Sequence, residues 1–134
     1  MENAMMACRI LLIDGNHDFT KLMVRLLICM GHQAGSCHDG HAGLLMAETW
    51  RPDVIFCDIG LPKLNGYEVA RRIRQNKALK DIRLVALSGY AASRDVELSL
   101  LAGFHQHIAK PIPLGTLRKT LACMPCLHAA RMAL

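Results

Sequence analysis

Five short aliphatic runs alternate with five segments of helical spacing, and this alternation limits the possible folds more than any other feature of the chain. The clearest runs are residues 8–13, 53–57 and 83–87, and two weaker ones are 33–37 and 106–109. Continuous apolar runs, without period-two alternation, are typical of strands that are covered on both faces. The pattern therefore predicts an α/β domain, with a five-stranded parallel sheet between two layers of helices.

The segments between these runs repeat their apolar residues at the period of an α-helix. The expected helices are residues 18–30, 40–50, 66–76, 94–102 and 113–123. Residues that stop or cap helices follow three of them, namely Pro52, Gly103 and Pro125. Helices that connect neighbouring parallel strands are the usual crossover in this fold class.

The length of 134 residues fits one domain with one hydrophobic core. We expect a disordered N-terminal end at residues 1–7, the domain at 8–124 and a short C-terminal tail at 125–134. Aliphatic side chains must build the core, because hydrophobic residues make up 52% of the chain but aromatic residues only 4%.

The net charge of +5 raises the question of an acidic partner. The densest basic group lies at residues 71–83 and has no interleaved aromatic residues, so we interpret it as a solvated helix face. We therefore expect no direct nucleic-acid binding.

Six cysteines are present, and most lie inside apolar runs, where cysteine behaves as a small hydrophobic residue. Cys123 and Cys126 form a C-x-x-C at the end of a predicted helix, whereas redox motifs of this kind open a helix. No apolar stretch has the length of a membrane span, and no signal peptide is apparent. These features predict free thiols, a cytoplasmic location and no membrane association.

Polar side chains follow four of the predicted strands at the point where each strand ends. Asp14, Asp58, Ser88 and Lys110 come after the first, third, fourth and fifth strands. Each of these residues taken alone could have a purely structural role, because aspartate and serine often cap helices and lysine is usually solvated. In open α/β sheets, however, ligands bind outside the carboxyl ends of the strands, so the convergence of all four favours a functional site.

The chemistry of this group of side chains fits phosphoryl transfer. Two carboxylates are sufficient to hold a Mg²⁺ ion that keeps several waters. One carboxylate can act as the nucleophile and form an aspartyl phosphate. The ammonium of Lys110 and the hydroxyl of Ser88 would then stabilise the phosphoryl oxygens.

The stretches around these residues resemble the receiver domain of bacterial response regulators and hybrid histidine kinases. The strongest stretch is RPDVIFCDIGLP at residues 51–62, followed by NGYEV at 65–69. VALSGY at 85–90 and HIAKP at 107–111 add to it, and the resemblance covers about residues 9–121. It implies a flavodoxin-like sheet in the order 2-1-3-4-5 with five helices.

The resemblance also implies roles at the metal and phosphate sites. Asp58 matches the phosphorylated aspartate, Asp14 matches the first of two acidic metal ligands, and Gly60 matches the residue whose backbone carbonyl binds the metal. The second acidic position holds Gly15, so one charged ligand is missing. We therefore expect Mg²⁺ as the cofactor, but weakly bound.

Three further positions match the residues that respond to phosphorylation in such domains. Ser88 matches the serine or threonine switch, Lys110 matches the lysine that orients the phosphate, and His107 stands where tyrosine or phenylalanine is more usual. Without phosphate, Lys110 is expected to pair with Asp58.

The sequence is compatible with two functions. The first is a phospho-accepting receiver that takes its phosphoryl group from a histidine kinase or phosphotransfer protein and signals to a downstream protein or an attached domain. The alternative is a pseudo-receiver, a protein-interaction module that works without phosphorylation, which Gly15 favours. In either case we expect a signalling module and not an enzyme with a separate substrate, either standing alone or as one domain of a hybrid kinase.

Overall fold

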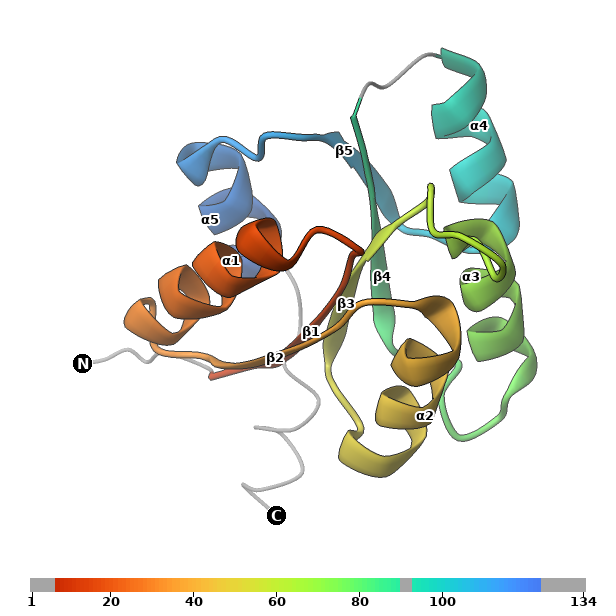
Figure 1. The fold of residues 1–134 in the computed structure, drawn as a ribbon, viewed down its shortest axis with the longest axis horizontal. Helices are drawn as coiled ribbons and strands as arrows, with labels where there is room; N and C mark the ends of the chain where they lie inside the picture. The colour runs from red at the N-terminus through yellow and green to blue at the C-terminus, as the bar shows by residue number, and fades with distance from the viewer. Residues whose placement is uncertain (1–6, 90–92, 124–134) are drawn as a thin grey trace.

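The computed structural model describes residues 7–89 and 93–123. Ten elements alternate along this part of the chain (Figure 1). They are β1 (Arg9–Ile13), α1 (His17–Cys29), β2 (Gln33–Cys37), α2 (Gly40–Trp50), β3 (Val54–Asp58), α3 (Gly66–Gln75), β4 (Arg83–Ser88), α4 (Ser93–Ala102), β5 (Gln106–Ala109) and α5 (Leu114–Ala122). All of them lie within the expected domain at 8–124, whereas the expected tail and residues 1–6 lie outside the described residues.

The five strands form one sheet in the order β2-β1-β3-β4-β5, and every neighbouring pair is parallel. This confirms the flavodoxin-like topology that the sequence resemblance implied. Helices α1 and α5 cover one face, and α2, α3 and α4 cover the other (Figure 1). Both faces are therefore buried, which explains the continuous apolar runs.

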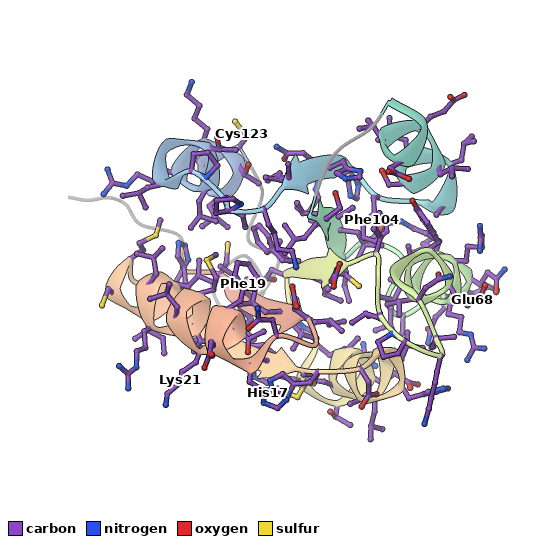
Figure 2. All side chains as sticks on the ribbon, turned by 45° about the horizontal axis from the view of Figure 1, so that its top comes forward. His17, Phe19, Lys21, Glu68, Phe104 and Cys123 are labelled. Atoms are coloured by element: carbon purple, nitrogen blue, oxygen red, sulfur yellow. The ribbon has the colours of Figure 1, made fainter. Side chains whose placement is uncertain are left out.

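The core has two layers because successive side chains of a strand point to opposite faces. Leu11 and Ile13 of β1 join the cluster beneath α2, α3 and α4. Ile10 and Leu12 join the cluster beneath α1 and α5. Figure 2 shows Phe104 inside the molecule, and it is 4% exposed.

The helix boundaries follow from local caps. Asn16, Asp39 and Asn65 each accept a backbone N–H three residues ahead, at the start of α1, α2 and α3 respectively. The cap at Asn16 makes α1 begin at His17, one residue before the predicted start. After α4, Gly103 has a φ of 117°, the left-handed geometry that ends helices.

The cysteines differ in part from the expectation of free thiols. Cys29, Cys37, Cys57 and Cys123 are free, but Cys8 is disulfide-bonded, so the expectation is wrong for Cys8. Apolar surroundings alone do not distinguish a packed thiol from a bonded one. Among the described residues, no helix has the length and apolarity that crossing a membrane requires.

Candidate phosphoacceptor site

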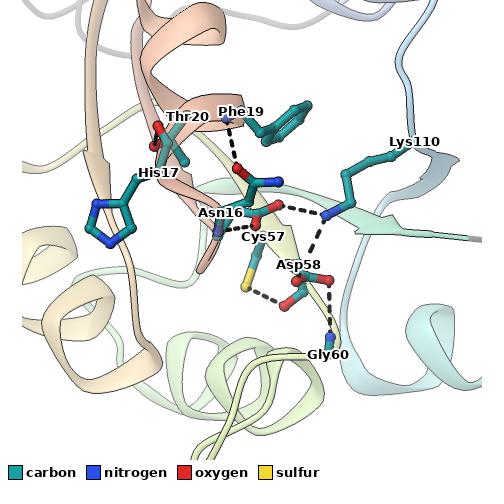
Figure 3. Close-up of polar contacts among 9 residues, drawn as sticks. Asn16, His17, Phe19, Thr20, Cys57, Asp58, Gly60 and Lys110 are labelled. Carbon is teal, nitrogen blue, oxygen red and sulfur yellow. Dashed lines mark hydrogen bonds and ion pairs between the residues drawn. The ribbon is translucent and has the colours of Figure 1, made fainter.

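The four polar residues predicted at strand ends meet at one edge of the sheet. β1, β3, β4 and β5 are adjacent and parallel, so their carboxyl ends share that edge. Asp14 follows β1, Asp58 and Ser88 are the last residues of β3 and β4, and Lys110 follows β5. The close-up in Figure 3 shows Asp58 and Lys110 pointing toward one another.

Lys110 contacts both carboxylates. Its Nζ lies 2.8 Å from Asp14 Oδ2 and 3.8 Å from Asp58 Oδ2. The Asp14 side chain is only 2% exposed, compared with 19% for Asp58. The predicted pairing with Asp58 is therefore present, but the shorter contact is with the more deeply buried Asp14.

Backbone contacts orient each of these side chains. Asp14 Oδ1 accepts the Asn16 N–H at 2.9 Å, and Asp58 Oδ1 accepts the Gly60 N–H at 3.0 Å. The Lys110 N–H donates to the Ser88 carbonyl at 2.7 Å, which joins the ends of β4 and β5. Asp58 Oδ2 has no comparably short contact to the described residues, so it is the carboxylate oxygen best placed to react.

The packing of α3 also determines where Asp58 lies. A Cβ at Gly66 would come within 2.6 Å of the Asp58 carbonyl oxygen and of Ile59 Cα. Only a glycine lets the start of α3 approach the end of β3 this closely. Helix α3 therefore supports the backbone that carries the candidate nucleophile.

No comparable close approach requires a glycine at position 15. A Cβ there would have only the His38 carbonyl nearby, at 3.8 Å, and Gly15 is not among the described residues with positive φ. The backbone would therefore accept an aspartate. The missing second acidic residue is a chemical difference and not a requirement of the fold.

The donor set for a metal is correspondingly small. In the described ranges, no three His, Cys, Asp or Glu side chains come together in a way that could hold a metal ion. Asp14 and Asp58 supply two carboxylates on the same edge, both within reach of Lys110. That set fits Mg²⁺, which takes one or two carboxylates and keeps waters for the rest. The role of the Gly60 carbonyl stays a prediction.

The candidate switch residues contact one another directly. Ser88 Oγ lies 2.7 Å from His107 Nε2, and Ser99 Oγ of α4 lies 3.1 Å from His107 Nδ1. Ser99 was not among the residues predicted from the sequence. Ser99 lies three residues after Val96 and three before the buried Ala102, which places all three on one face of α4. A polar residue at this spacing between two apolar ones was the available signal in the sequence.

Cys57 was not assigned a role, and its surroundings make it unreactive. The side chain is fully buried next to Asp58 and donates to the Asp58 carbonyl at 3.5 Å. Burial, and then the negative charges of Asp58 and Asp14, raise the pKa of the Cys57 thiol far above its usual range. The thiolate is the reactive form, so Cys57 acts as a packing residue.

A flavodoxin-like sheet with two carboxylates, a lysine and a hydroxyl at its carboxyl edge defines the class of phosphorylation-linked signalling domains. Residues 10–122 match the family described as "Response regulator receiver domain". The chain belongs to this family, and it is a receiver domain of two-component signalling.

The relatives agree with this assignment. The polar-differentiation response regulator DivK of Brucella anthropi is 28% identical over 112 residues, which cover 84% of this chain and 91% of DivK. The receiver domain of sensor histidine kinase PA1611 from Pseudomonas aeruginosa is 30% identical, with a TM-score of 0.78 over 86% of this chain and 94% of that one. That structure has a magnesium ion coordinated in its active site cleft.

The fold is also shared with more distant structures. The chemotaxis protein CheY4 of Vibrio cholerae has a TM-score of 0.83, covering 89% of this chain and 99% of that one, at 23% identity. This likeness shows the fold alone. Receiver domains as a family interact with histidine kinases or phosphotransfer proteins and with downstream effectors.

Proposed function

We propose that Asp58 accepts a phosphoryl group from a phosphohistidine of a histidine kinase or phosphotransfer protein. The observation that carries this proposal is the environment of Asp58. Its Oδ1 is held by the Gly60 N–H, and its Oδ2 faces the Lys110 ammonium at the open edge of the sheet. A partly exposed carboxylate oxygen with a cation beside it suits attack on a phosphoryl group.

The transfer is a displacement at phosphorus. A bond forms between Asp58 Oδ2 and phosphorus, while the bond from phosphorus to the donor's ring nitrogen breaks, and that nitrogen keeps the electron pair. Lys110 lies within 3.8 Å of Asp58 Oδ2, so its ammonium can offset the charge of the phosphoryl oxygens. The protein is the acceptor, and no separate small substrate is converted.

Asp14 and Asp58, with the Gly60 carbonyl, would hold Mg²⁺ at this site. When bound, the ion would neutralise part of the charge that the phosphoryl oxygens bring. We propose that this binding is weak, because Gly15 leaves the site with two carboxylates only.

A cytoplasmic location stays a prediction.

The test is phosphorylation by acetyl phosphate with Mg²⁺, read by the mobility shift in a phosphate-affinity gel. We expect one phosphorylated species in the wild type and none in Asp58→Ala. Asp39→Ala is the matched control, because Asp39 is an exposed aspartate that caps α2. If Asp58→Ala is still labelled, Asp58 is not the acceptor.

The pseudo-receiver is the second candidate, and Gly15 is the observation that favours it. Asp58, Ser88 and Lys110 oppose it, because they meet in a geometry that a phosphate-independent module does not need. A wild-type protein that acetyl phosphate and Mg²⁺ do not label would support the pseudo-receiver.

A further inference from the structure

His107 of β5 connects the end of β4 to the buried side of α4. Its Nε2 lies 2.7 Å from Ser88 Oγ, and its Nδ1 lies 3.1 Å from Ser99 Oγ. Ser99 is fully buried, and Ser88 is 6% exposed. Both ring nitrogens are therefore engaged by hydroxyl groups from two different elements.

The hydrogen atoms in this chain of contacts can be assigned by counting donors. Ser99 Oγ lies 2.7 Å from the Val96 carbonyl oxygen, which can only accept, so the single hydroxyl hydrogen of Ser99 points there. Ser99 must then accept from His107 Nδ1, which has to carry a hydrogen. In the neutral ring Nε2 has none, so Nε2 accepts the hydroxyl hydrogen of Ser88.

We propose that His107 is a positioning residue that holds the Ser88 hydroxyl hydrogen away from Asp58, and that Ser99 enforces this by fixing the ring as the Nδ1–H tautomer. The inference rests on the proposed function. Beyond that function, the inference is that two acceptors compete for one hydrogen. Ser88 must leave His107 Nε2 in order to donate to a phosphoryl oxygen on Asp58.

The same contacts link this competition to helix α4. When Ser88 leaves, Nε2 loses its donor, and the ring is held only through Ser99 on α4. A change at Asp58 would then alter the contact between His107 of β5 and Ser99 of α4. A phenylalanine at position 107 could take part in neither hydrogen bond, so this link depends on the histidine.

The tautomer is tested directly by nitrogen-15 NMR of the histidine rings at about pH 8, because the nitrogen shifts distinguish the two neutral tautomers from each other and from the protonated ring. We expect His107 as the Nδ1–H form in the wild type. Ser99→Ala should shift it toward the Nε2–H form, because the acceptor at Nδ1 is gone. A wild-type His107 in the Nε2–H form overturns the proposal.

Thr120→Ala is the matched control for loss of a buried hydroxyl. Thr120 is buried on α5 and accepts from Gln106 Nε2 of β5. The hydrogen bonds of the His107 ring go to Ser88 and Ser99 and not to Thr120. Thr120→Ala should leave the His107 tautomer unchanged. An equal tautomer shift in Thr120→Ala would mean that general loosening, and not Ser99, is responsible.

The competition is tested by titration with beryllofluoride and Mg²⁺ at the same pH. His107→Phe and Ser99→Ala should each bind the phosphoryl analogue roughly two- to tenfold more tightly, the net worth of one neutral hydrogen bond. Thr120→Ala should match the wild type. The double variant should gain little beyond either single change, since both release the same hydrogen.

Unchanged or weaker affinity in both His107→Phe and Ser99→Ala overturns the proposed competition. Failure of the proposed function has a different signature. A wild-type protein that does not bind beryllofluoride contradicts phosphoryl acceptance at Asp58, while the NMR spectra still decide whether Ser99 fixes the His107 tautomer. If Ser99→Ala does not fold, His107→Phe carries the affinity test.

Discussion

The Lys110 ammonium makes its shortest contact with Asp14, 96 residues earlier in the chain, at 2.8 Å between Nζ and Oδ2. Asp58 lies a further ångström away, with 3.8 Å from Nζ to its Oδ2. The preference follows burial, since Asp14 is nearly inaccessible to water and depends more on a partner charge. The lysine therefore stabilises the resting site chiefly through Asp14 and stays within reach of the acceptor.

Lys110→Ala should remove this shared cation. We expect a loss of about 1–3 kcal/mol in the free energy of unfolding without metal, because a buried carboxylate loses its charged partner. Mg²⁺ binding should be unchanged or tighter, but beryllofluoride should no longer produce the conformational response. Urea denaturation and NMR titration measure these effects.

Lys119→Ala is the control for this variant, since Lys119 is an exposed lysine of α5. It should change neither stability nor the response. A Lys110→Ala protein that responds to beryllofluoride like the wild type would contradict the orienting role of the lysine.

Gly66→Ala should disturb the backbone that carries Asp58. The new methyl group would meet backbone atoms of Asp58 and Ile59 at 2.6 Å, and backbone cannot yield as a flexible side chain can. We expect about 1–3 kcal/mol of destabilisation, typical of overpacking, and slower phosphorylation by acetyl phosphate. Equal stability of Gly66→Ala and wild type would show that α3 can move away at no cost.

Gly115→Ala provides the opposite expectation in another helix. Nothing lies within 4 Å of a Cβ at Gly115, and its φ is not positive. Alanine should therefore stabilise the protein by about 0.4–1 kcal/mol, because the unfolded chain loses conformational freedom. Thermal unfolding of the two variants should show a lower melting temperature for Gly66→Ala and a higher one for Gly115→Ala. The comparison distinguishes the effect of a close backbone contact from the effect of helix propensity.

The sequence predicted those features that depend on local pattern. The apolar runs correctly located the strands, and parallel strands necessarily bring Asp14, Asp58, Ser88 and Lys110 to one edge. The strand order came from the resemblance to receiver domains, because periodicity does not specify which strands are neighbours.

Other features depend on tertiary packing, so the sequence could not reveal them. The contact of His107 with Ser99 arises because α4 packs against β5, and nothing in the residues between them specifies that distance. The closer approach of Lys110 to Asp14 likewise reflects the relative burial of the two carboxylates. The disulfide at Cys8 was missed because its apolar neighbours indicated only a buried side chain.

His105 should make stability depend on pH. Burial, and then repulsion by Arg74 and Arg83, lower the pKa of His105 below its ordinary value of 6.5. Between the lowered and the ordinary pKa, the unfolded state binds more protons than the folded state. The stabilisation is therefore fully present above pH 6.5 and is lost as the pH falls from there toward the lowered pKa.

His105→Asn is the informative variant. His105 Nδ1 accepts from the Leu84 N–H and from Arg74 Nη2, and an asparagine oxygen can replace that acceptor without titrating. Urea denaturation between about pH 7.5 and 5 should show a smaller loss of stability in the variant than in the wild type. Burial also lowers the pKa of His32, so part of the pH dependence should remain. Identical pH profiles would exclude His105 as a contributor.

Gly15→Asp should restore a third carboxylate to the metal site. Affinity for hard cations rises with the number of charged ligands. We expect Mg²⁺ to bind roughly ten- to a hundredfold more tightly, corresponding to about 1–3 kcal/mol for one charged interaction. Without metal, the melting temperature should fall, because three carboxylates repel one another more than two.

The structure removes backbone strain as a competing cause of that destabilisation. Gly15 does not have positive φ, and a Cβ there has its nearest contact at 3.8 Å, with the His38 carbonyl oxygen. Added Mg²⁺ should therefore restore the melting temperature of Gly15→Asp, because the bound ion offsets the repulsion among the three carboxylates. Gly15→Asn is the matched control, because it has the same shape without the charge and should be neither destabilised nor much tighter for Mg²⁺. Magnesium titrations of all three proteins by calorimetry decide the matter. Equal affinity of wild type and Gly15→Asp would mean that another group, with Asp18 as the nearest acidic candidate in the sequence, already supplies the missing ligand.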